Sequence, residues 1–506
     1  MSYPELDTHF IGGAFGCGGG EVHDVIDPST GETIWSFTAD TKDDVDAAIS
    51  AAGSAFPGWA GATPAERSKA LLRLAAELDG LAEALAQAET SQAGKPIRLS
   101  REFDVPGSID NVTFFAGAAR SLEGKAAAEY SGDHTSFIRR EALGVVGSIS
   151  PWNYPLQMAV WKILPAIAAG NTIVLKASEL TPITTLMLAR ACHTAGIPDG
   201  VVNVVNGPGR TTGEALVGDP RIAMTSFTGS TTVGRHIAGL AASNGTRVHL
   251  ELGGKAPFVV FDDADLEAAI RGAVAAALIN SGQDCTAATR AYVHRSRFGE
   301  FVEGVADLMD AARLGPTRCE DTDQGPLIST QHRDRVARMV DVARAEGARV
   351  VTGGRTPGGS LDAGAYYEPT LLVDADQRSS IIQDEVFGPV LAALPFDDDE
   401  QAFDLANDVR FGLAASAWTT DVFRAQLAGR RLQAGTVWIN DHIPIISEMP
   451  HGGMKSSGYG RDMSSYSLEE YTQVKHVMSE LTGSISKPWH QTILHLDRAP
   501  DSEPAP

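Results

Sequence analysis

The sequence predicts an α/β protein built from two doubly wound domains, and three observations favour this fold class. Short β-rich runs alternate with helical runs over two long stretches of the chain, and Gly253-Gly254 separates the two stretches. Such alternation is typical of parallel sheets that carry helices on both faces. The chain has 506 residues, which is too long for a single hydrophobic core. We therefore expect two packed α/β domains.

The N-terminal region carries a clear helix signal. Thr63-Pro64-Ala65-Glu66 forms a capping box with proline at the first helical position. Leucines follow it at helical spacing, namely Leu71, Leu72, Leu74, Leu78, Leu81 and Leu85. The pattern predicts one long amphipathic helix that ends near Gly94-Lys95-Pro96.

The first domain is expected to span residues 1–125 and 141–252. Its predicted strands are residues 145–150, 172–176, 201–205, 223–227 and 247–250. The second domain is expected over residues 253–454, with a helix around 266–278. Its predicted strands are residues 291–294, 349–352, 414–418 and 437–440.

Two further segments fit neither alternation of strands and helices. They are residues 126–140, between the first helices and the first sheet, and residues 455–487. We expect each of them to be arm-like. The tail from residue 488 to 506 is polar and proline-rich, so we expect disorder at its end.

The composition excludes several classes of protein. A formal charge of −23 argues against nucleic acid as a partner, because phosphate contacts require clustered Lys and Arg. The N-terminus lacks a basic segment followed by an apolar run, and no stretch approaches the roughly 18 apolar residues that span a bilayer. We therefore expect a cytoplasmic protein with no membrane partner and no nucleic-acid partner.

The four cysteines are Cys17, Cys192, Cys285 and Cys319. They are too few and too widely separated for a disulfide framework or a zinc site, so we expect no metal. A lone cysteine is usually a buried small hydrophobe, and a reactive thiol must be recognised by its neighbours. Cys285 follows Ser281-Gly282-Gln283-Asp284, whose small and polar side chains suit a thiol presented on a loop.

Two polar residues near strand ends are further candidates for chemistry. Glu251 ends an apolar strand just before two glycines, where a ligand can approach the backbone closely. Asn153 lies between two prolines that stiffen the turn after a strand. Each candidate has a structural alternative: a strand-end ion pair for Glu251, a turn amide for Asn153 and a packed thiol for Cys285.

A glycine-containing loop lies between a strand and a helical run at Gly229-Ser230-Thr231-Thr232-Val233-Gly234. Its backbone N–H groups and the following helix N-terminus could face a pyrophosphate. The spacing differs from the common G-x-G-x-x-G motif. On spacing alone, a plain strand-to-helix turn therefore stays open as the alternative.

Taken together, these residues resemble the aldehyde dehydrogenase superfamily, from about Phe10 to Met478. Five motifs occur in the family's order: Pro151-Trp152-Asn153, Phe227-Thr228-Gly229-Ser230 with Gly234, Glu251-Leu252-Gly253-Gly254-Lys255, Gly282-Gln283-Asp284-Cys285, and Glu385-Val386-Phe387-Gly388-Pro389. Five ordered matches are very specific, whereas any one of them is weak. The resemblance implies an aldehyde dehydrogenase-like fold, with an NAD-binding domain, a catalytic domain and a small β-arm for oligomerisation.

The resemblance implies NAD-dependent oxidation of an aldehyde to a carboxylic acid through a thioester. Cys285 would be the nucleophile, Glu251 the general base, and Asn153 with the Cys285 backbone N–H the oxyanion hole. A thiol with a pKa of about 8.5 needs a base or a positive setting to attack, and a carboxylate can also activate water for hydrolysis. A catalytically silent homologue is the alternative from another class. Loss of the thiol, base or amide would mark it, and all three are present.

The resemblance also assigns a dinucleotide site. Lys176 and Glu179 would hold the adenosine ribose hydroxyls, and a carboxylate there would repel a 2′-phosphate, which favours NAD over NADP. The cofactor-binding residues that the resemblance implies are Ile149, Pro151, Trp152, Asn153, Lys176, Ser178, Glu179, Gly209, Gly213, Phe227, Gly229, Ser230, Val233, Leu252, Glu385 and Phe387.

Within the superfamily, the chain is most similar to bacterial aminobutyraldehyde dehydrogenases, which act on 4-aminobutanal, an intermediate of putrescine breakdown. The similarity lies in residues 280–287, 447–453 and 457–464. It implies a substrate tunnel with aromatic walls and an acid that receives the ammonium group. The candidates are Tyr154, Trp161 and Trp438 for the walls, and Asp104, Asp110, Asp284 and Glu448 for the acid. For each acid, a solvated surface carboxylate is the alternative.

Betaine aldehyde dehydrogenases share much of this pattern, and their cationic substrate suits the same walls, so they are the alternative. Semialdehyde dehydrogenases would place an Arg at the tunnel for the substrate carboxylate, and the sequence identifies none. Members of the family pair their subunits through a β-arm. Residues 126–140 and 455–487 therefore imply a homo-oligomer, namely a tetramer built from dimers.

Overall fold

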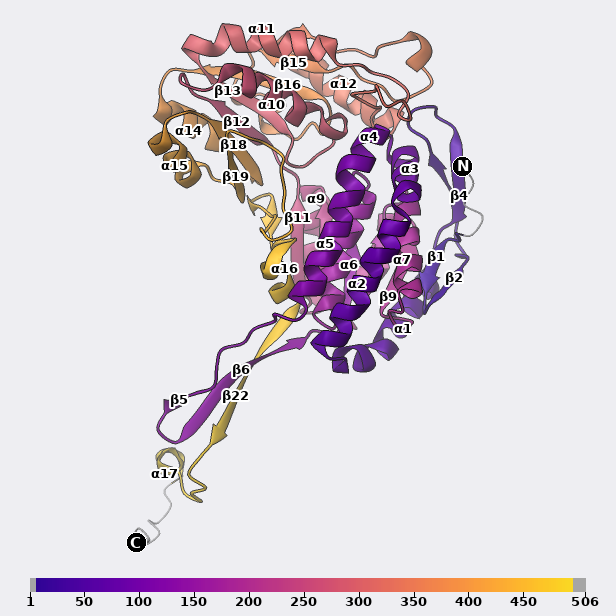
Figure 1. The fold of residues 1–506 in the computed structure, drawn as a ribbon, viewed down its shortest axis with the longest axis vertical. Coiled ribbons are helices and arrows are strands. Elements are labelled where there is room, and N and C mark those ends of the chain that lie inside the picture. The colour runs from indigo at the N-terminus through magenta and orange to yellow at the C-terminus, as the bar shows by residue number, and fades with distance from the viewer. Residues whose placement is uncertain (1–5, 495–506) are drawn as a thin grey trace. The chain divides into compact units, whose positions relative to one another are not determined.

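The computed structural model describes residues 6–494, which form two compact units (Figure 1). The larger unit comprises residues 6–122 and 142–472, and the smaller unit comprises residues 123–141 and 473–494. The larger unit holds two sheets, and we call the part built on each sheet the first and the second domain. The predicted fold of two doubly wound domains is confirmed.

The first sheet has eight strands in the order β2-β1-β9-β8-β7-β10-β11-β21. Its five central strands are parallel and match the five predicted strands: β7 (Val145–Ile149), β8 (Thr172–Ala177), β9 (Val202–Asn206), β10 (Ile222–Gly229) and β11 (Arg247–Leu252). From β7 the chain builds outward through β8 and β9, and it then returns to the other side of β7 with β10. The strand order therefore reverses between β7 and β10, which is the usual place for a ligand in such sheets.

Helices cover both faces of the first sheet because alternate residues of each strand point to opposite sides. On β7, Val145 packs toward α1 (Lys42–Gly61), whereas Val146 packs toward α6 (Pro155–Ala168). The helix α9 (Thr231–Ser243) lies on the α1 side. On the α6 side pack α2 (Pro64–Gly80), α5 (Val105–Ala118) and α7 (Ile183–Thr194).

The helix predicted from Pro64 begins as expected but does not run to Gly94 unbroken. The Thr63 side chain accepts a hydrogen bond from the Glu66 backbone, and the Glu66 carboxylate accepts one from the Thr63 backbone, so the capping box is confirmed. The helix α2 ends at Gly80, and a second helix, α3 (Ala82–Ala93), follows. The prediction of one helix was wrong at this point, because the sequence pattern ignored the low helix propensity of Gly80.

The second sheet has seven strands in the order β14-β15-β16-β13-β12-β18-β19. Their bounds are β12 (Ala256–Val260), β13 (Ala288–His294), β14 (Arg349–Thr352), β15 (Thr370–Val373), β16 (Val390–Phe396), β18 (Ala414–Trp418) and β19 (Thr436–Ile439). The sequence did not single out β12, β15 and β16. All three are almost fully buried, so their sequences lack the alternation that marks a half-buried strand.

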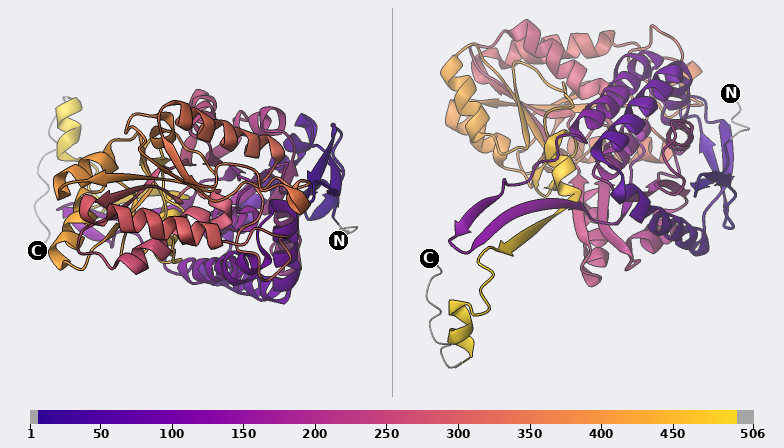
Figure 2. Two further views of the ribbon diagram at one scale, coloured as in Figure 1. Left: turned by 90° about the horizontal axis from the view of Figure 1, so that it is seen from above. Right: turned by 60° about the horizontal axis from the view of Figure 1, so that its bottom comes forward.

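Helices also lie on both sides of the second sheet, as the two views in Figure 2 show. The helices α10 (Leu266–Leu278) and α11 (Arg295–Ala311) cover one face. The helices α12 (Thr330–Ala345), α14 (Asp399–Asn407) and α15 (Val422–Arg431) cover the other.

The smaller unit contains a three-stranded sheet in the order β22-β6-β5. Its strands are β5 (Ala128–Ser131), β6 (His134–Ala142) and β22 (Thr472–Glu480), and the helix α17 (Pro488–Ile493) follows. The predicted arm at residues 126–140 falls on β5 and β6. Residues 455–471 belong instead to the larger unit, because β21 (Gly458–Tyr459) pairs with β11 and α16 (Ser464–Glu470) packs on α5 and α6.

The predicted tail begins with α17, and its residues 495–506 lie outside the described part of the chain. Within residues 6–494, no helix combines the length and the apolar character needed to cross a bilayer.

Candidate active site

A cavity of about 350 Å³ lies at the carboxyl ends of β7, β10 and β11, beside the reversal in strand order. Segments of the second domain close its other side. The lining residues are Phe103, Pro151, Trp152, Asn153, Tyr154, Gln157, Met158, Trp161, Thr228, Gly229, Ser230, Glu251, Leu252, Gly253, Asp284, Cys285, Thr286, His332, Arg335, Glu385, Phe387, Ile443, Ile445 and His451. Enclosed hollows of this size, with few polar groups among apolar ones, are typical of small-ligand sites.

A left-handed turn after α10 brings Cys285 to the cavity. Asn280, Ser281 and Gly282 have φ values of 47°, 56° and 71°. A side chain at Gly282 would place its Cβ 2.2 Å from the carbonyl oxygen of Gly388, so this position requires glycine. The turn reverses the chain within three residues, and Cys285 emerges partly exposed at the cavity wall.

Amide side chains hold this turn in place. Asn280 Nδ2 donates to the carbonyl of Asn153 at 2.9 Å, and Asn153 Nδ2 donates to the carbonyl of Gln283 at 3.0 Å. Gln283 in turn accepts a hydrogen bond from the Ile328 backbone at 2.8 Å. An amide nitrogen carries two hydrogens, so Asn153 keeps one for a ligand beside Cys285.

The surroundings of Cys285 favour the neutral thiol. Burial raises the pKa of this thiol well above its ordinary value, and the nearby carboxylates of Asp284, Glu385 and Glu251 raise it further. A thiolate is the reactive form. The protein therefore needs a base or an added positive charge to generate the nucleophile.

Glu251 is the last residue but one of β11 and is only 4% exposed. Neither of its carboxylate oxygens has a hydrogen-bond partner within residues 6–494. Burial raises the pKa of Glu251 well above its ordinary value, and the carboxylate of Asp462 adds to the effect. A carboxylate with a raised pKa is suited to accept a proton near neutral pH.

Two residues of the second domain, Glu385 and Phe387, form a further part of the wall. Glu385 accepts a hydrogen bond from the Gly254 backbone at 3.0 Å, and burial raises its pKa to about 7. Phe387 has a φ of 60°, and its ring meets that of Trp152 edge-on, with the centroids 5.3 Å apart. The strained backbone at Phe387 thus serves to aim the ring into the cavity.

The predicted ribose-binding pair lies at the end of β8. Lys176 Nζ contacts the Glu179 carboxylate at 2.8 Å. Burial alone would raise the pKa of Glu179, but the ammonium of Lys176 holds it below its ordinary value. Glu179 therefore keeps its negative charge at neutral pH.

The structure brings thirteen of the predicted site residues to the cavity wall, namely Pro151, Trp152, Asn153, Tyr154, Trp161, Gly229, Ser230, Glu251, Leu252, Asp284, Cys285, Glu385 and Phe387. The other residues predicted for the cofactor do not line the cavity, and they lie on β7, β8, β10, the segments that follow β8 and β9, and the first turn of α9, namely Ile149, Lys176, Ser178, Glu179, Gly209, Gly213, Phe227 and Val233.

Four of the residues predicted for the substrate do not line the cavity. Asp104 is fully buried and contacts Lys95 Nζ at 2.5 Å, while Asp110 accepts a hydrogen bond from Ser447. Glu448 is exposed on the surface. Trp438 donates to the carbonyl of Pro444 at 2.8 Å. Of the four predicted acids, only Asp284 reaches the wall.

The wall also contains residues that the sequence analysis did not name: Phe103, Gln157, Met158, Thr286, His332, Arg335, Ile443, Ile445 and His451. Helical spacing could have found two of them, because Gln157 and Met158 stand three and four residues after Tyr154 and share a face with Trp161. Phe103 lies on the short helical segment Ser100–Asp104 of the first domain, and the others come from loops or from the second domain. Sequence spacing gives no signal for any of them.

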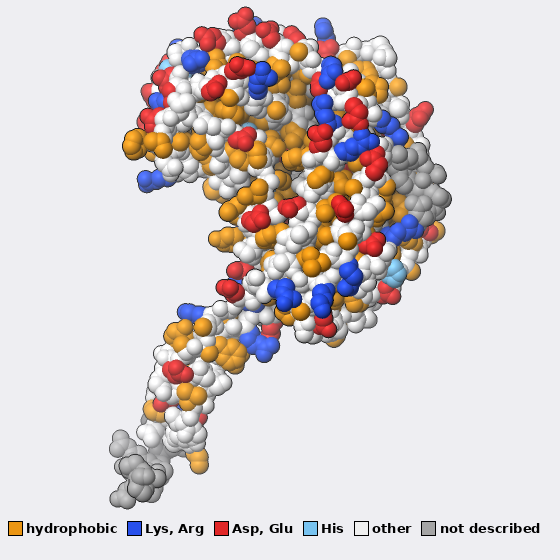
Figure 3. Space-filling view, in the orientation of Figure 1, with side chains coloured by type: hydrophobic (Ala, Val, Ile, Leu, Met, Phe, Trp, Pro, Cys, Tyr) orange, Lys and Arg blue, Asp and Glu red, His pale blue; other side chains and the backbone are white. Residues whose placement is uncertain are grey.

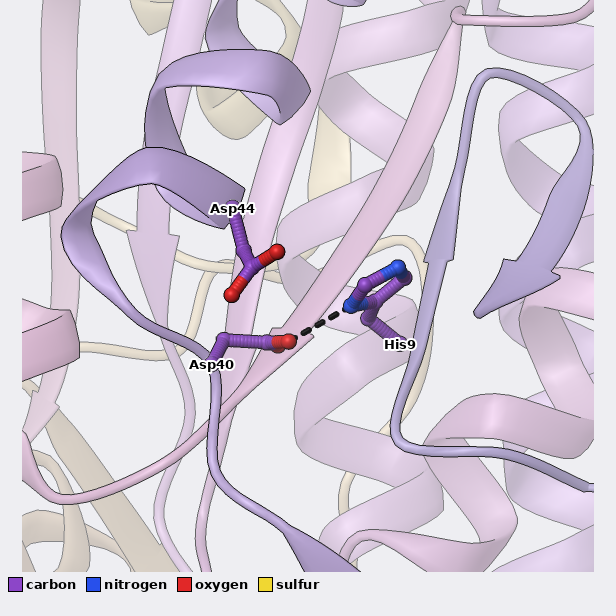
Figure 4. A group of neighbouring side chains, drawn as sticks. All are labelled: His9, Asp40 and Asp44. Atoms are coloured by element: carbon purple, nitrogen blue, oxygen red, sulfur yellow. Dashed lines mark hydrogen bonds and ion pairs between the residues drawn. The ribbon is translucent and has the colours of Figure 1, made fainter. Parts of the chain in front are cut away.

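A second cluster of ligand-type side chains lies outside the cavity wall, at the start of the first domain (Figure 4). His9 Nδ1 contacts Asp40 Oδ1 at 2.5 Å, and the other Asp40 oxygen accepts a hydrogen bond from the Asn206 backbone. Asp44 accepts from Thr41 as part of the cap of α1. The protein itself satisfies these carboxylates, so the cluster fastens β1 (His9–Ile11) to the sheet.

Comparison with known proteins identifies the family of this chain. The model of the aldehyde dehydrogenase family matches residues 17–477. The chain is 39% identical to the betaine aldehyde dehydrogenase of Bacillus subtilis (strain 168), over 90% of this chain and 94% of that protein. It is also 39% identical to the 2-aminomuconic semialdehyde dehydrogenase of Bos taurus, over 93% of this chain and 97% of that protein.

A solved structure, the betaine aldehyde dehydrogenase of Staphylococcus aureus in complex with NAD+, matches with a TM-score of 0.93. It is 37% identical, and the match covers 95% of this chain and 95% of that one. The chain therefore belongs to the aldehyde dehydrogenase family. The predicted aldehyde dehydrogenase-like fold is confirmed.

Alkylation of Cys285 by iodoacetamide should continue to accelerate above pH 9 in the free protein, because the raised pKa delays formation of the reactive thiolate. Mass spectrometry of the Cys285 peptide after timed labelling at a series of pH values measures this. The exposed Cys319 supplies a reference, and the buried Cys192 should stay unlabelled while the protein is folded. A Cys285 rate that reaches its plateau below pH 8.5 would contradict the expected environment.

Proposed function

We propose that this aldehyde dehydrogenase oxidises an ω-aminoaldehyde, with 4-aminobutanal as the best candidate, and that it uses NAD. Asp284 carries the proposal, because it lines the cavity next to Cys285, where its carboxylate accepts hydrogen bonds from the Tyr154 hydroxyl at 2.8 Å and from Thr286. Tyr154 and Trp161 add aromatic surfaces to the same wall. A carboxylate and aromatic faces together stabilise an ammonium group that has left water.

In the proposed mechanism, Glu251 takes the proton of Cys285, and the sulfur adds to the aldehyde carbonyl carbon. The free N–H of Asn153 and the backbone N–H of Cys285 stabilise the resulting oxyanion. NAD, when bound, supplies the hydride acceptor that converts this adduct to a thioester. Glu251 then removes a proton from water, the oxygen attacks the thioester carbon, and Cys285 leaves as the acid forms. Glu251 must release its first proton before it can accept the second.

The residues around the cavity fit a dinucleotide. Gly229 and Ser230 line the wall and immediately precede the first turn of α9, where backbone N–H groups lack helical partners. The charged pair of Lys176 and Glu179 at the end of β8 offers a donor and an acceptor for ribose hydroxyls. The solved complex of the related dehydrogenase with NAD+ supports the same cofactor.

The sequence identified no Arg for a substrate that carries a carboxylate, but the structure places Arg335 on the wall. Arg335 donates to the carbonyl oxygens of Val386 and Glu385. Burial lowers the pKa of His451 to about 4, so this histidine is neutral at physiological pH. Asp284 offers an amine a carboxylate partner on the same wall. Betaine aldehyde is the alternative substrate, since its cation suits the same wall and a relative carries that name.

Wild-type protein should oxidise 4-aminobutanal with a higher kcat/KM than butanal, and Asp284→Asn should reduce that preference roughly tenfold, about 1.4 kcal/mol. The substitution removes the charge but preserves the shape of the side chain. Initial rates of NADH formation with both aldehydes measure the ratio. Glu448→Gln, at an exposed acid outside the cavity, is the matched control and should leave the ratio unchanged.

Equal kcat/KM values for the two aldehydes in the wild type would reject the aminoaldehyde proposal. Assays with betaine aldehyde in parallel decide between the two cationic substrates.

Cys285→Ala should abolish NADH formation from every aldehyde. Activity in that variant would overturn the assignment of the nucleophile.

Glu179→Gln should lower the ratio of kcat/KM with NAD to that with NADP, because the neutral amide no longer repels a 2′-phosphate. Steady-state assays with each dinucleotide at a fixed aldehyde concentration give the ratio. Glu32→Gln, at an exposed turn, is the control. If the ratio stayed at the wild-type value, Glu179 would have no part in cofactor choice.

We also propose a homo-oligomer, with a tetramer built from two dimers as the expected state. Exposed large hydrophobic side chains support it: Val422, Phe423, Ile439, Ile446, Met449, Met454 and Tyr459 in the larger unit, and Tyr130, Val474, Met478, Leu481, Ile485, Trp489, Ile493 and Leu494 in the smaller unit. Phe423 is 82% exposed, which is costly for a phenyl ring in water. Figure 3 shows hydrophobic side chains at the surface of both units.

Light scattering coupled to size-exclusion chromatography should give a mass of four subunits at micromolar concentration. The free energy gained when the exposed apolar side chains are buried between subunits is the physical reason. A monomer over the whole concentration range would reject the proposal. The cytoplasmic location stays a prediction.

A further inference from the structure

Buried polar atoms that the proposed mechanism does not use lie next to Glu251, on His249 and Asp462. Four side-chain atoms lack a hydrogen-bond partner within residues 6–494: both carboxylate oxygens of Glu251, Nε2 of His249 and Oδ1 of Asp462. His249 Nε2 lies 3.7 Å from Glu251 Oε1 and 3.8 Å from Asp462 Oδ1. The imidazole of His249 therefore stands between two carboxylates.

The surrounding structure fixes the orientation of this ring. His249 and Glu251 are two residues apart on β11, so their side chains leave the strand on the same face. His249 Nδ1 is 2.8 Å from the hydroxyl of Ser226 on the neighbouring strand β10. A Cβ at Gly460 would lie 1.9 Å from the imidazole, so glycine at that position makes room for the ring. With Nδ1 held by Ser226, Nε2 has to point at the carboxylates.

The charged groups around the ring come from several elements. Lys162 on α6 pairs with Asp462 at 2.7 Å, and Arg461 donates its backbone N–H to Glu470 on α16. Burial lowers the pKa of His249 well below its ordinary value, and the charges of Lys162 and Arg461 lower it further. The imidazole is therefore neutral and carries one proton. The Ser226 hydroxyl can donate to Nδ1, which leaves that proton on Nε2.

We propose that His249 is a positioning residue for the general base, because its Nε2–H attracts the Glu251 carboxylate and favours the ionised form. The inference rests on the role proposed for Glu251. The separation of 3.7 Å exceeds a hydrogen bond by about 0.5 Å, and a small rotation of the Glu251 side chain closes it. A donor aimed at a carboxylate opposes the effect of burial, and it prepares Glu251 to accept a proton again after each transfer.

Two substitutions separate the two sides of the ring. His249→Gln can place an amide N–H near the position of Nε2, whereas the shorter His249→Asn can bond only to Ser226. Without the donor, the pKa of Glu251 rises, so the acid limb of the pH profile of kcat should move up by about one pH unit in His249→Asn. Below that limb, kcat should fall about tenfold. His249→Gln should restore the wild-type limb, and KM for NAD should be unchanged in both variants.

Circular dichroism and NAD binding confirm that each variant is folded before the profiles are compared. Coincident profiles for the Gln and Asn variants, whether shifted or not, overturn the inference, because they show that the atom facing Glu251 does not matter. In that case an active wild type leaves the proposed function in place. A wild type that forms no NADH from any aldehyde overturns both proposals.

Discussion

Two hydrogen bonds between the domains set the geometry on which the rest of the site depends. Asn280 of the second domain donates to the backbone of Asn153 in the first, and Asn153 donates back to the backbone of Gln283. Left-handed backbone at Asn280 and Ser281 is unfavourable by itself, and these bonds offset part of its cost. The thiol of one domain and the amide donor of the other are thereby held on the wall of one cavity.

Burial has the largest effect on the pKa values of the acidic groups at this cavity wall. The thiol of Cys285 and the carboxyls of Glu251 and Glu385 all have pKa values above their ordinary range, with desolvation as the largest cause in each case. Burial therefore favours the protonated forms of the Cys285 thiol and the Glu251 carboxyl. A cationic nicotinamide ring placed beside these groups would favour the thiolate and the carboxylates together. Arrival of the cofactor would thus prepare the nucleophile as well as supply the hydride acceptor.

The sequence was a good guide wherever the information is local. The five parallel strands of the first sheet, the capping box at Thr63 and the helix at residues 266–278 follow from alternation, spacing and caps. The buried strands β12, β15 and β16 did not, because continuous apolar runs do not distinguish a strand from a helix. The break at Leu81 was missed because the leucine spacing continues across Gly80, which has a low helix propensity. The motifs around Cys285, Glu251 and Asn153 named residues that the fold does bring to one wall.

The substrate side was harder to predict, because acid residues are common and only folding decides which of them face a cavity. Asp104 and Asp284 look alike in the sequence, yet Asp104 is buried against Lys95 while Asp284 faces the cavity. His249 and His451 are also ordinary in the sequence. His249 lies beside the carboxylate of Asp462, which is more than 200 residues away in the chain. The ring of His451 lies beside that of Trp161, about 290 residues away.

The helix α6 has a consequence for how this protein could acquire other substrates. Tyr154, Met158 and Trp161 lie along one face of α6 or at its N-terminus, and the first and last are seven positions apart, or about 10 Å at the helical rise. The thiol and the general base come from other segments of the chain. Substitutions along this face could therefore change the length and polarity of the aldehyde that the cavity accepts, while the thiol and the general base kept their positions.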